Sequence, residues 1–203
     1  MSPGKRVPLE LAQNLSTHLV EILSPSCEKI KVVGSVRRCK PLINDVEVIA
    51  LARESHIKDL FGETVSIDST SVDVLLDRFH EIEHQGWRID SRKQNKVAKR
   101  LRHIQTGLIA DLYVIMDRRA WGSYVVIRTG PRSFSREIIS AAYRNYMHFD
   151  GRLLLHNHAK KRSPCWPYCA RIIPLIHESD VFERLKITYI SPVEREKQYG
   201  SGI

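Results

Sequence analysis

Residues 34–49 read GSVRRCKPLINDVEVI, and the rest of the chain can be interpreted from this stretch. The apolar run Ile30–Val33 before it predicts a strand that ends on the turn Gly34-Ser35. Nine residues separate this turn from Asp45, which alternates with a valine and then Glu47. Residues i and i+2 of a strand share a face, so we expect both carboxylates to project together. The valines between and after them are then expected to point into the core.

Two carboxylates side by side repel each other unless a divalent cation lies between them. A phosphate-binding turn beside a metal-binding strand is the minimum equipment for chemistry on a nucleoside triphosphate. A third carboxylate, Asp111, interrupts the apolar run Leu108–Met116. A lone aspartate in a buried strand is costly unless it is paired or bound to metal. A salt bridge to an arginine is the ordinary explanation, but the strand with two carboxylates favours metal ligation by Asp111.

The charge balance favours a polyanionic partner over a merely solvated basic surface. The 203 residues carry a formal net charge of +9 and suffice for one large domain or two small ones. Residues 91–104 contain six Lys or Arg residues and no acidic residue, just before the strand of Asp111. Such a run is commonly a solvated face, and contact with a phosphate backbone is the competing interpretation. The candidate DNA-binding residues are Lys96, Lys99, Arg100 and Arg102.

The sequence shows no apolar run near 18 residues and no apolar signal-peptide core, so we expect an intracellular protein without a membrane span. The cysteines Cys27 and Cys39 are then expected to be small buried residues with reduced thiols. A second candidate site consists of His156, His158, Cys165 and Cys169, which could together bind zinc. The Cys-x3-Cys spacing and the prolines and aromatic residues around it favour an ordinary turn instead.

Hydrophobic periodicity predicts both helices and strands along the chain. Helices are expected over Pro8–Leu23, Ser69–His84, 134–146 and Glu178–Leu185. Strands are expected over 28–33, 45–51, 91–104, 108–116 and 121–128, with turns at 105–107, 129–133 and 150–151. The segments 53–67 and 190–196 are polar, and no regular element is expected there. The charged break at 117–119 divides a domain 1–118 from a second domain 119–203.

In this order, the motifs resemble those of nucleotidyltransferases, and specifically of DNA polymerase family X. The run Gly34–Arg38, the pair Asp45 and Glu47, and the later lone Asp111 fit the Gly-Ser-x-Arg-Arg, Asp-apolar-Asp/Glu and strand-Asp pattern. Thr129-Gly130 followed by Phe134 and Arg136 resembles the turn that cradles the incoming nucleotide. Residues 178–196 resemble the C-terminal ending of the family. The N-terminal DNA-binding or lyase domain usual in the family has no counterpart, so the chain resembles a reduced form with a catalytic palm and a thumb-like subdomain.

The resemblance implies an α+β fold, with a palm made of a mixed sheet flanked by helices in residues 1–118 and a small α+β subdomain for the nucleotide and the nascent base pair in residues 119–203. It implies that Asp45, Glu47 and Asp111 hold two Mg²⁺ ions, for which Mn²⁺ can substitute, and that a nucleoside monophosphate passes from a triphosphate to a primer 3′-hydroxyl. It implies that Arg37 forms a structural ion pair. It implies DNA and a nucleoside triphosphate as partners, a monomeric protein, and a role in DNA repair or short gap filling. The nucleotide-binding residues that it implies are Gly34, Ser35, Arg38, Thr129, Gly130, Arg132 and Ser135.

The chain departs from the family pattern at four places. Glu47 stands where the family has Asp, and Ile109 where it has Arg near the primer end. Ile127-Arg128 replaces the aromatic pair before the turn, which leaves the choice between deoxy- and ribonucleotides open. Gly130-Pro131 replaces Gly-Ser at an unusual cis peptide, and because cis X–Pro bonds cost only about 0.5–1 kcal/mol, we predict a cis bond here.

Three other functions fit part of these observations. A template-independent terminal transferase would use the same residues. A nucleotidyltransferase acting on a small molecule or a protein explains the three carboxylates but not the basic charge. A non-catalytic nucleic-acid-binding protein predicts an incomplete set of carboxylates, and all three are present.

Overall fold

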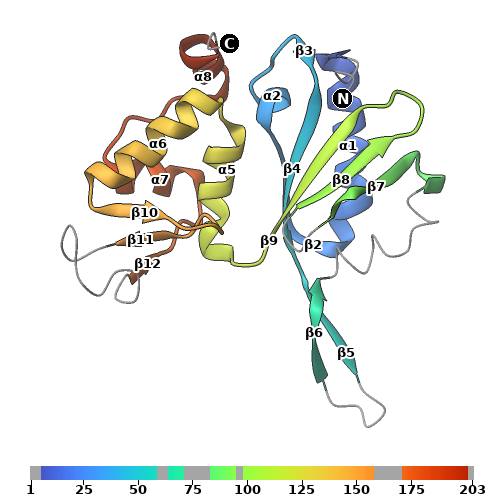
Figure 1. Cartoon of the computed structure of the whole chain (residues 1–203), viewed down its shortest axis with the longest axis horizontal. Coiled ribbons are helices and arrows are strands. Elements are labelled where there is room, and N and C mark those ends of the chain that lie inside the picture. Colours follow the sequence, from blue (N-terminus) through green and yellow to red (C-terminus); the bar gives the residue numbers. More distant parts are fainter. Residues whose placement is uncertain (1–5, 59–63, 71–82, 95–97, 158–170, 201–203) are drawn as a thin grey trace. The chain divides into compact units, whose positions relative to one another are not determined.

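The computed structural model describes residues 6–58, 64–70, 83–94, 98–157 and 171–200 (Figure 1). The chain forms two compact units. The first unit comprises Met1–Val32 and Pro41–Met116, and the second comprises Val33–Lys40 and Asp117–Ile203. The segment with the Gly34-Ser35 turn therefore belongs to the second unit, although the strands before and after it in the sequence lie in the first.

The first unit is built on a mixed sheet with the strand order β2-β4-β9-β8-β7. Its helices are α1 (Leu9–Leu23) and the 3-10 turn η1 (Ser24–Ser26). Its strands are β1 (Val7–Pro8), β2 (Cys27–Val33), β3 (Leu42–Ile43), β4 (Asp45–Ala52), β5 (Glu54–Lys58), β6 (Thr64–Thr70), β7 (Trp87–Gln94), β8 (Ala98–His103) and β9 (Ile109–Ile115). The α+β class with a mixed sheet flanked by helices is confirmed at this level.

Alternation of apolar and polar residues decides which face of this sheet is core. Val46 and Val48 of β4 and Ala110 and Leu112 of β9 are fully buried, whereas the residues between them are half-buried. Helix α1 packs against the sheet (Figure 1). Its buried residues are Ala12, Ser16, Leu19 and Leu23. The helix predicted over Pro8–Leu23 is thus confirmed, and Leu11 of this helix is exposed.

Two segments of the first unit differ from the prediction. The polar segment 53–67 contains the antiparallel pair β5–β6, and the basic segment 91–104 is divided between two antiparallel strands, β7 and β8. The turn at 105–107 is confirmed, with Gly107 at a φ of +72° and its N–H donated to the carbonyl of His103. Of the helix predicted over Ser69–His84, residues 71–82 lie outside the described part, and its first two residues belong to β6.

The second unit combines helices with a three-stranded antiparallel sheet of order β10-β11-β12. Its helices are α2 (Gly34–Arg37), η2 (Arg118–Ala120), α5 (Trp121–Thr129), α6 (Arg132–Arg144), α7 (Glu178–Leu185) and α8 (Pro192–Tyr199). Its strands are β10 (Met147–Phe149), β11 (Leu155–Asn157) and β12 (Arg171–Ile173). The core of this unit lies between α5, α6, α7 and the sheet, around Phe134, Ile138, Leu155, Val181 and Phe182.

The prediction of a strand over 121–128 is wrong, because this segment is helix α5. Its centre, Tyr-Val-Val-Ile, is typical of strands. Seven of its nine residues are buried, so no polar face shows a helical period in the sequence. Gly122 brings the helix against the backbone of the 175–177 segment, where its N–H is donated to the carbonyl of Leu175 at 2.7 Å. Tertiary packing has here overridden local preference.

The other elements of the second unit agree with the sequence more closely. Helix α6 begins two residues before the predicted position, and α7 has the predicted bounds, with Val181, Phe182 and Leu185 buried. The polar tail, for which no regular element was expected, forms helix α8. Ser191 caps this helix: its hydroxyl accepts from the N–H of Glu194 at 3.3 Å, and its own N–H is donated to the Glu194 carboxylate at 3.1 Å.

Candidate functional site

The three predicted metal ligands lie on two neighbouring parallel strands of the first unit. In the register of β4 and β9, Glu47 pairs with Asp111 and Asp45 pairs with Ile109. Paired strands lie about 4.8 Å apart, so Glu47 and Asp111 are lateral neighbours on the same face. Asp45 joins them because it is two residues from Glu47. All three are half-buried, on the face opposite the fully buried valines.

Asp111 forms the salt bridge to an arginine that is the ordinary explanation for a lone aspartate in a strand, through two nitrogens on one edge of the guanidinium group of Arg100. Arg100 of β8 pairs with Asp111 in the strand register. Its Nε and Nη2 each donate to one oxygen of the carboxylate, both at 2.6 Å, and the two side chains are 19% and 16% exposed. The hydrogen bond to Asp111, and the charges of Asp111, Asp45 and Asp90, raise the pKa of Arg100, although partial burial works against them. The guanidinium group is thus within the electric field of two of the predicted ligands.

The donor set is suited to a hard divalent cation, because carboxylate oxygens are the ligands that Mg²⁺ and Mn²⁺ prefer. Asp45 and Glu47 on β4, and Asp111 beside them on β9, could hold such ions. Within the described ranges, no group of three or more His, Cys, Asp or Glu side chains is arranged around a common point suited to a metal ion. In this arrangement both oxygens of Asp111 are engaged by Arg100.

The basic residues predicted to contact DNA do not all share one face. Arg100 and Arg102 lie on the face of the carboxylates, whereas Lys99 pairs with Leu112 on the core face. Lys96 lies outside the described residues. Arg102 donates to the carbonyl of Gly107 at 3.3 Å, and its Nη2 lies 3.8 Å from the carboxylate of Asp90.

Arg88 is a basic residue of this face that the sequence interpretation missed. The register of β7 and β8 places it opposite Arg102. Arg88 lies outside the basic run 91–104, and only the pairing of the two strands brings it to the same face. The carboxylates on β4 and β9 are therefore followed laterally by arginines on β8 and β7.

The predicted nucleotide-binding residues lie in the second unit. Gly34, with a φ of +67°, begins the short helix α2, and the carbonyl of Ser35 accepts from the N–H of Lys40 at 3.1 Å. Arg38 donates from Nε to a carboxylate oxygen of Glu196 at 2.6 Å and from Nη1 to the carbonyl of Thr129. The α2 turn and the end of α5 are therefore joined through Arg38.

The turn after α5 is shorter than the predicted 129–133, since α6 already begins at Arg132, but its backbone has the expected conformation. Helix α5 ends at Thr129, Gly130 has a φ of +63°, and the Gly130–Pro131 bond is cis, as predicted. A Cβ on Gly130 would lie 3.3 Å from Nη1 of Arg38, so this glycine allows the close approach. Ser135 donates to the carbonyl of Ile127 at 2.7 Å. These residues thus cluster in one place, whereas Arg132 is exposed at the start of α6.

The prediction that Arg37 forms a structural ion pair is confirmed. Arg37 donates to both carboxylate oxygens of Glu178, at 2.6 and 3.1 Å, and to the hydroxyl of Thr129 at 2.8 Å. Glu178 also accepts from Arg195 at 2.9 Å, and the Arg195 side chain is fully buried. Burial raises the pKa of the Glu178 carboxyl, but the hydrogen bonds and charges of Arg37 and Arg195 outweigh it and hold the pKa below its ordinary value.

The candidate zinc ligands are only partly described. His156 pairs with His148 across β10 and β11, and its Nε2 lies 3.2 Å from a carboxylate oxygen of Asp150. His158, Cys165 and Cys169 lie outside the described residues.

The two cysteines of the described part carry free thiols and differ in burial. Cys27 is buried as predicted, and burial raises the pKa of its thiol to about 11. The prediction that Cys39 is buried is wrong, since it is exposed at the end of the α2 turn, with a φ of +57°.

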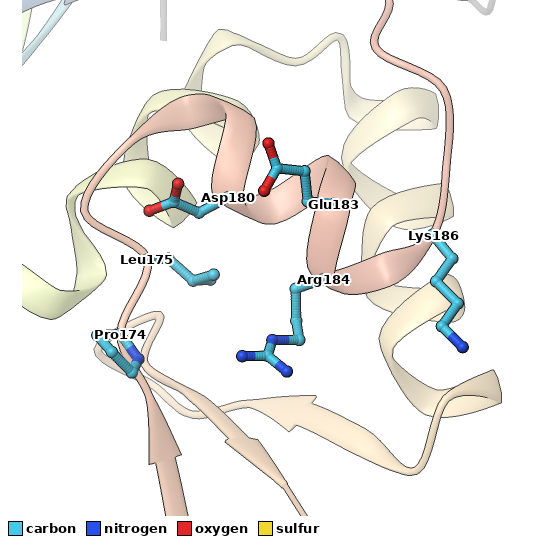
Figure 2. A pocket seen from close by; sticks show the side chains of 6 residues that line it. All are labelled: Pro174, Leu175, Asp180, Glu183, Arg184 and Lys186. Carbon is cyan, nitrogen blue, oxygen red and sulfur yellow. The ribbon is translucent and has the colours of Figure 1, made fainter.

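A pocket of about 330 Å³ lies on the second unit beside α7 (Figure 2). It is lined by Pro174, Leu175, Asp180, Glu183, Arg184 and Lys186. Asp180 accepts from the N–H of His177 and so caps the helix. None of the residues that line this pocket is among the predicted site residues, and the pocket contributes nothing to the chemistry proposed below.

Comparison of the sequence with protein families and with curated proteins does not identify a function for this chain. No protein-family model matches the chain, and no curated protein matches it. No helix in the part of the chain that the structure describes is long and apolar enough to cross a membrane.

Proposed function

We propose that this protein is a nucleotidyltransferase that transfers a nucleoside monophosphate from a nucleoside triphosphate to the 3′-hydroxyl of a nucleic acid, in the manner of DNA polymerase family X. The observation that carries the proposal is the register of β4 and β9, which makes Glu47 and Asp111 lateral neighbours with Asp45 on the same face. Residues that lie 64 positions apart in the sequence are thereby brought together on one face. Three carboxylates on one face of a sheet offer the oxygen ligands that a hard divalent cation prefers.

Each carboxylate has a proposed part in the reaction. Asp45, Glu47 and Asp111 would hold two Mg²⁺ ions, and Asp111 would lie nearest the primer terminus. Bound there, the ions would lower the pKa of the 3′-hydroxyl and neutralise the triphosphate and the leaving pyrophosphate. Glu47 is one methylene longer than the aspartate of the family and can reach its ion from a position slightly further back.

The arginines beside the carboxylates support a nucleic acid as the acceptor. Arg102 and Arg88 occupy the same face as the carboxylates, one and two strands further along the sheet. Guanidinium groups bind phosphate oxygens with paired hydrogen bonds, so a backbone crossing β8 and β7 would be held on this face. The formal net charge of +9 is expected to strengthen this binding at low salt.

The second unit would bind the triphosphate. Ser35 would contribute its backbone N–H and hydroxyl. Arg38 would contribute charge-assisted hydrogen bonds, and its guanidinium group is already positioned by Glu196 and the carbonyl of Thr129. The Thr129-Gly130 turn would hold the sugar and the base-proximal part of the nucleotide.

The test is primer extension with labelled dNTPs and NTPs on single-stranded, recessed and gapped DNA. We expect Asp111→Asn and Glu47→Gln to reduce extension at least about 100-fold, since metal-bound charge in such sites contributes several kcal/mol. Glu28→Gln, on an exposed position of β2, is the matched control and should extend like the wild type. Wild-type rates in Asp111→Asn would remove this residue from the site. Transfer of label to a small molecule or a protein, without any extension of nucleic acid, would favour the alternative class of acceptor.

A further inference from the structure

We propose that Arg100 is an internal counter-ion that holds Asp111 in the free protein and leaves it for a phosphate of the nucleic acid, so that the carboxylates bind metal tightly only when substrate is present. This inference rests on the function proposed above. Arg100 is thereby a positioning residue that couples substrate binding to metal binding, whereas the basic run 91–104 indicated only a contact with DNA.

The geometry of the pair supports an exchange of partners. Arg100 engages both oxygens of Asp111 at 2.6 Å, in the bidentate arrangement that guanidinium groups also form with phosphate. A phosphate can therefore replace the carboxylate without loss of hydrogen bonds to the arginine. The pair is only partly buried, with side chains 19% and 16% exposed, so a backbone phosphate can approach it from solvent.

The charges on this face explain why the exchange would matter for the metal. Asp45, Glu47 and Asp111 together carry three negative charges, and the fixed positive charge of Arg100 offsets one of them. A divalent cation that binds here must compete with the guanidinium group for Asp111. Once Arg100 is drawn to a phosphate, both oxygens of Asp111 become available to the metal.

Two neighbouring arginines, Arg102 and Arg88, could bring a phosphate of the nucleic-acid backbone close to Arg100. Arg102 is two residues from Arg100 on β8 and shares its face, and Arg88 lies opposite Arg102 on β7. A backbone held by these two residues would present its next phosphate close to Arg100. By linkage, metal should then strengthen nucleic-acid binding by the same factor by which nucleic acid strengthens metal binding.

The test measures Mn²⁺ affinity by the electron paramagnetic resonance signal of the free ion, with and without a primer–template that ends in a 3′-deoxy residue. Without nucleic acid, Arg100→Met is expected to bind Mn²⁺ at least about 10-fold more tightly than the wild type. Arg102→Met removes the same charge from the same face but not from Asp111, and should change the affinity less than about 2-fold. Primer–template should tighten Mn²⁺ binding in the wild type and leave it almost unchanged in Arg100→Met.

Two outcomes would overturn the inference. If Arg100→Met binds Mn²⁺ as the wild type does, or more weakly, then Arg100 only orients Asp111. If Arg100→Met combined with Asp111→Asn keeps the gain, the effect does not pass through this carboxylate. A failure of the proposed function would be seen in other variants. Asp45→Asn and Glu47→Gln would then bind Mn²⁺ and extend primers like the wild type, and this result does not depend on the behaviour of Arg100→Met.

Discussion

Removing the charge of Glu178 is expected to destabilise the second unit strongly, since this carboxylate neutralises two arginines. In Glu178→Gln the shape is kept and the charge is lost. Arg195 then remains in the core with a positive charge that has no partner of opposite sign. Its guanidinium carbon lies 4.7 Å from the ring centre of Phe134 and 5.2 Å from that of Phe182, so the side chain is enclosed.

The size of the stability loss in Glu178→Gln follows from the burial of the ion pair with Arg195. Breaking a buried ion pair by removing one partner costs about 3–5 kcal/mol. Glutamine can still accept one hydrogen bond from Arg37 or Arg195, which favours the lower end. Glu178 is also the first residue of α7, where loss of a negative charge costs about 0.3–1 kcal/mol more. We therefore expect the free energy of unfolding to fall by about 3 kcal/mol, which corresponds to roughly 6–12 °C in the thermal midpoint of a chain of this size.

The assay is urea and thermal denaturation of the full chain, followed by circular dichroism. The control is Glu183→Gln, an exposed position on the same helix, where a change within about 0.5 kcal/mol is expected. The double variant Glu178→Gln, Arg195→Met removes the isolated charge and should be more stable than Glu178→Gln alone. A cost below about 1 kcal/mol for Glu178→Gln, or no recovery in the double variant, would refute the reasoning.

Two further predictions concern the same unit. The stability difference between the wild type and Glu178→Gln should depend on pH. Because the folded-state pKa of Glu178 is lowered from 4.5, the stability that its charge contributes is complete above that value and is lost as the pH falls below it. Denaturation of both proteins at pH 3 to 7 would measure this dependence. Gly122→Ala should cost about 1–3 kcal/mol or more, since its Cβ would lie 2.1 Å from the carbonyl oxygen of His177. Gly151→Ala, which meets nothing within 4 Å, is the control for Gly122→Ala, and equal urea midpoints for the two variants would contradict this account.

The sequence was informative wherever a single period or a short-range signal decided the outcome. The alternation of Asp45 and Glu47 with valines determined both the strand and the face of the carboxylates. The helix over Glu178–Leu185 followed from three apolar residues at helical spacing. In the tail, Ser191 and Glu194 form a capping box that is visible in the sequence, so α8 could have been predicted from these residues.

Features that depend on contacts between distant segments of the chain could not be predicted from local sequence patterns. Helix α5 is buried on nearly all sides, so its residues show a strand-like composition and no helical period. The pairing of Arg100 with Asp111 depends on how β7, β8 and β9 align. A shift of one residue would have turned Arg100 to the core face, and no local pattern in residues 91–104 determines that alignment.

Two of the arginine–carboxylate systems described above, Arg195–Glu178 and Arg100–Asp111, use the same chemistry in different surroundings, and this difference makes the proposals separable. The Arg195 side chain is 0% exposed and enclosed by aromatic rings, so its charge cannot reach another partner when Glu178 is lost. The Arg100 side chain is 19% exposed on a sheet face and can turn to water or to a phosphate. Disrupting the first pair should therefore appear as lost stability, and disrupting the second as changed metal affinity with little change in stability. A large fall in the free energy of unfolding of Arg100→Met would show that the Arg100–Asp111 pair also stabilises the fold.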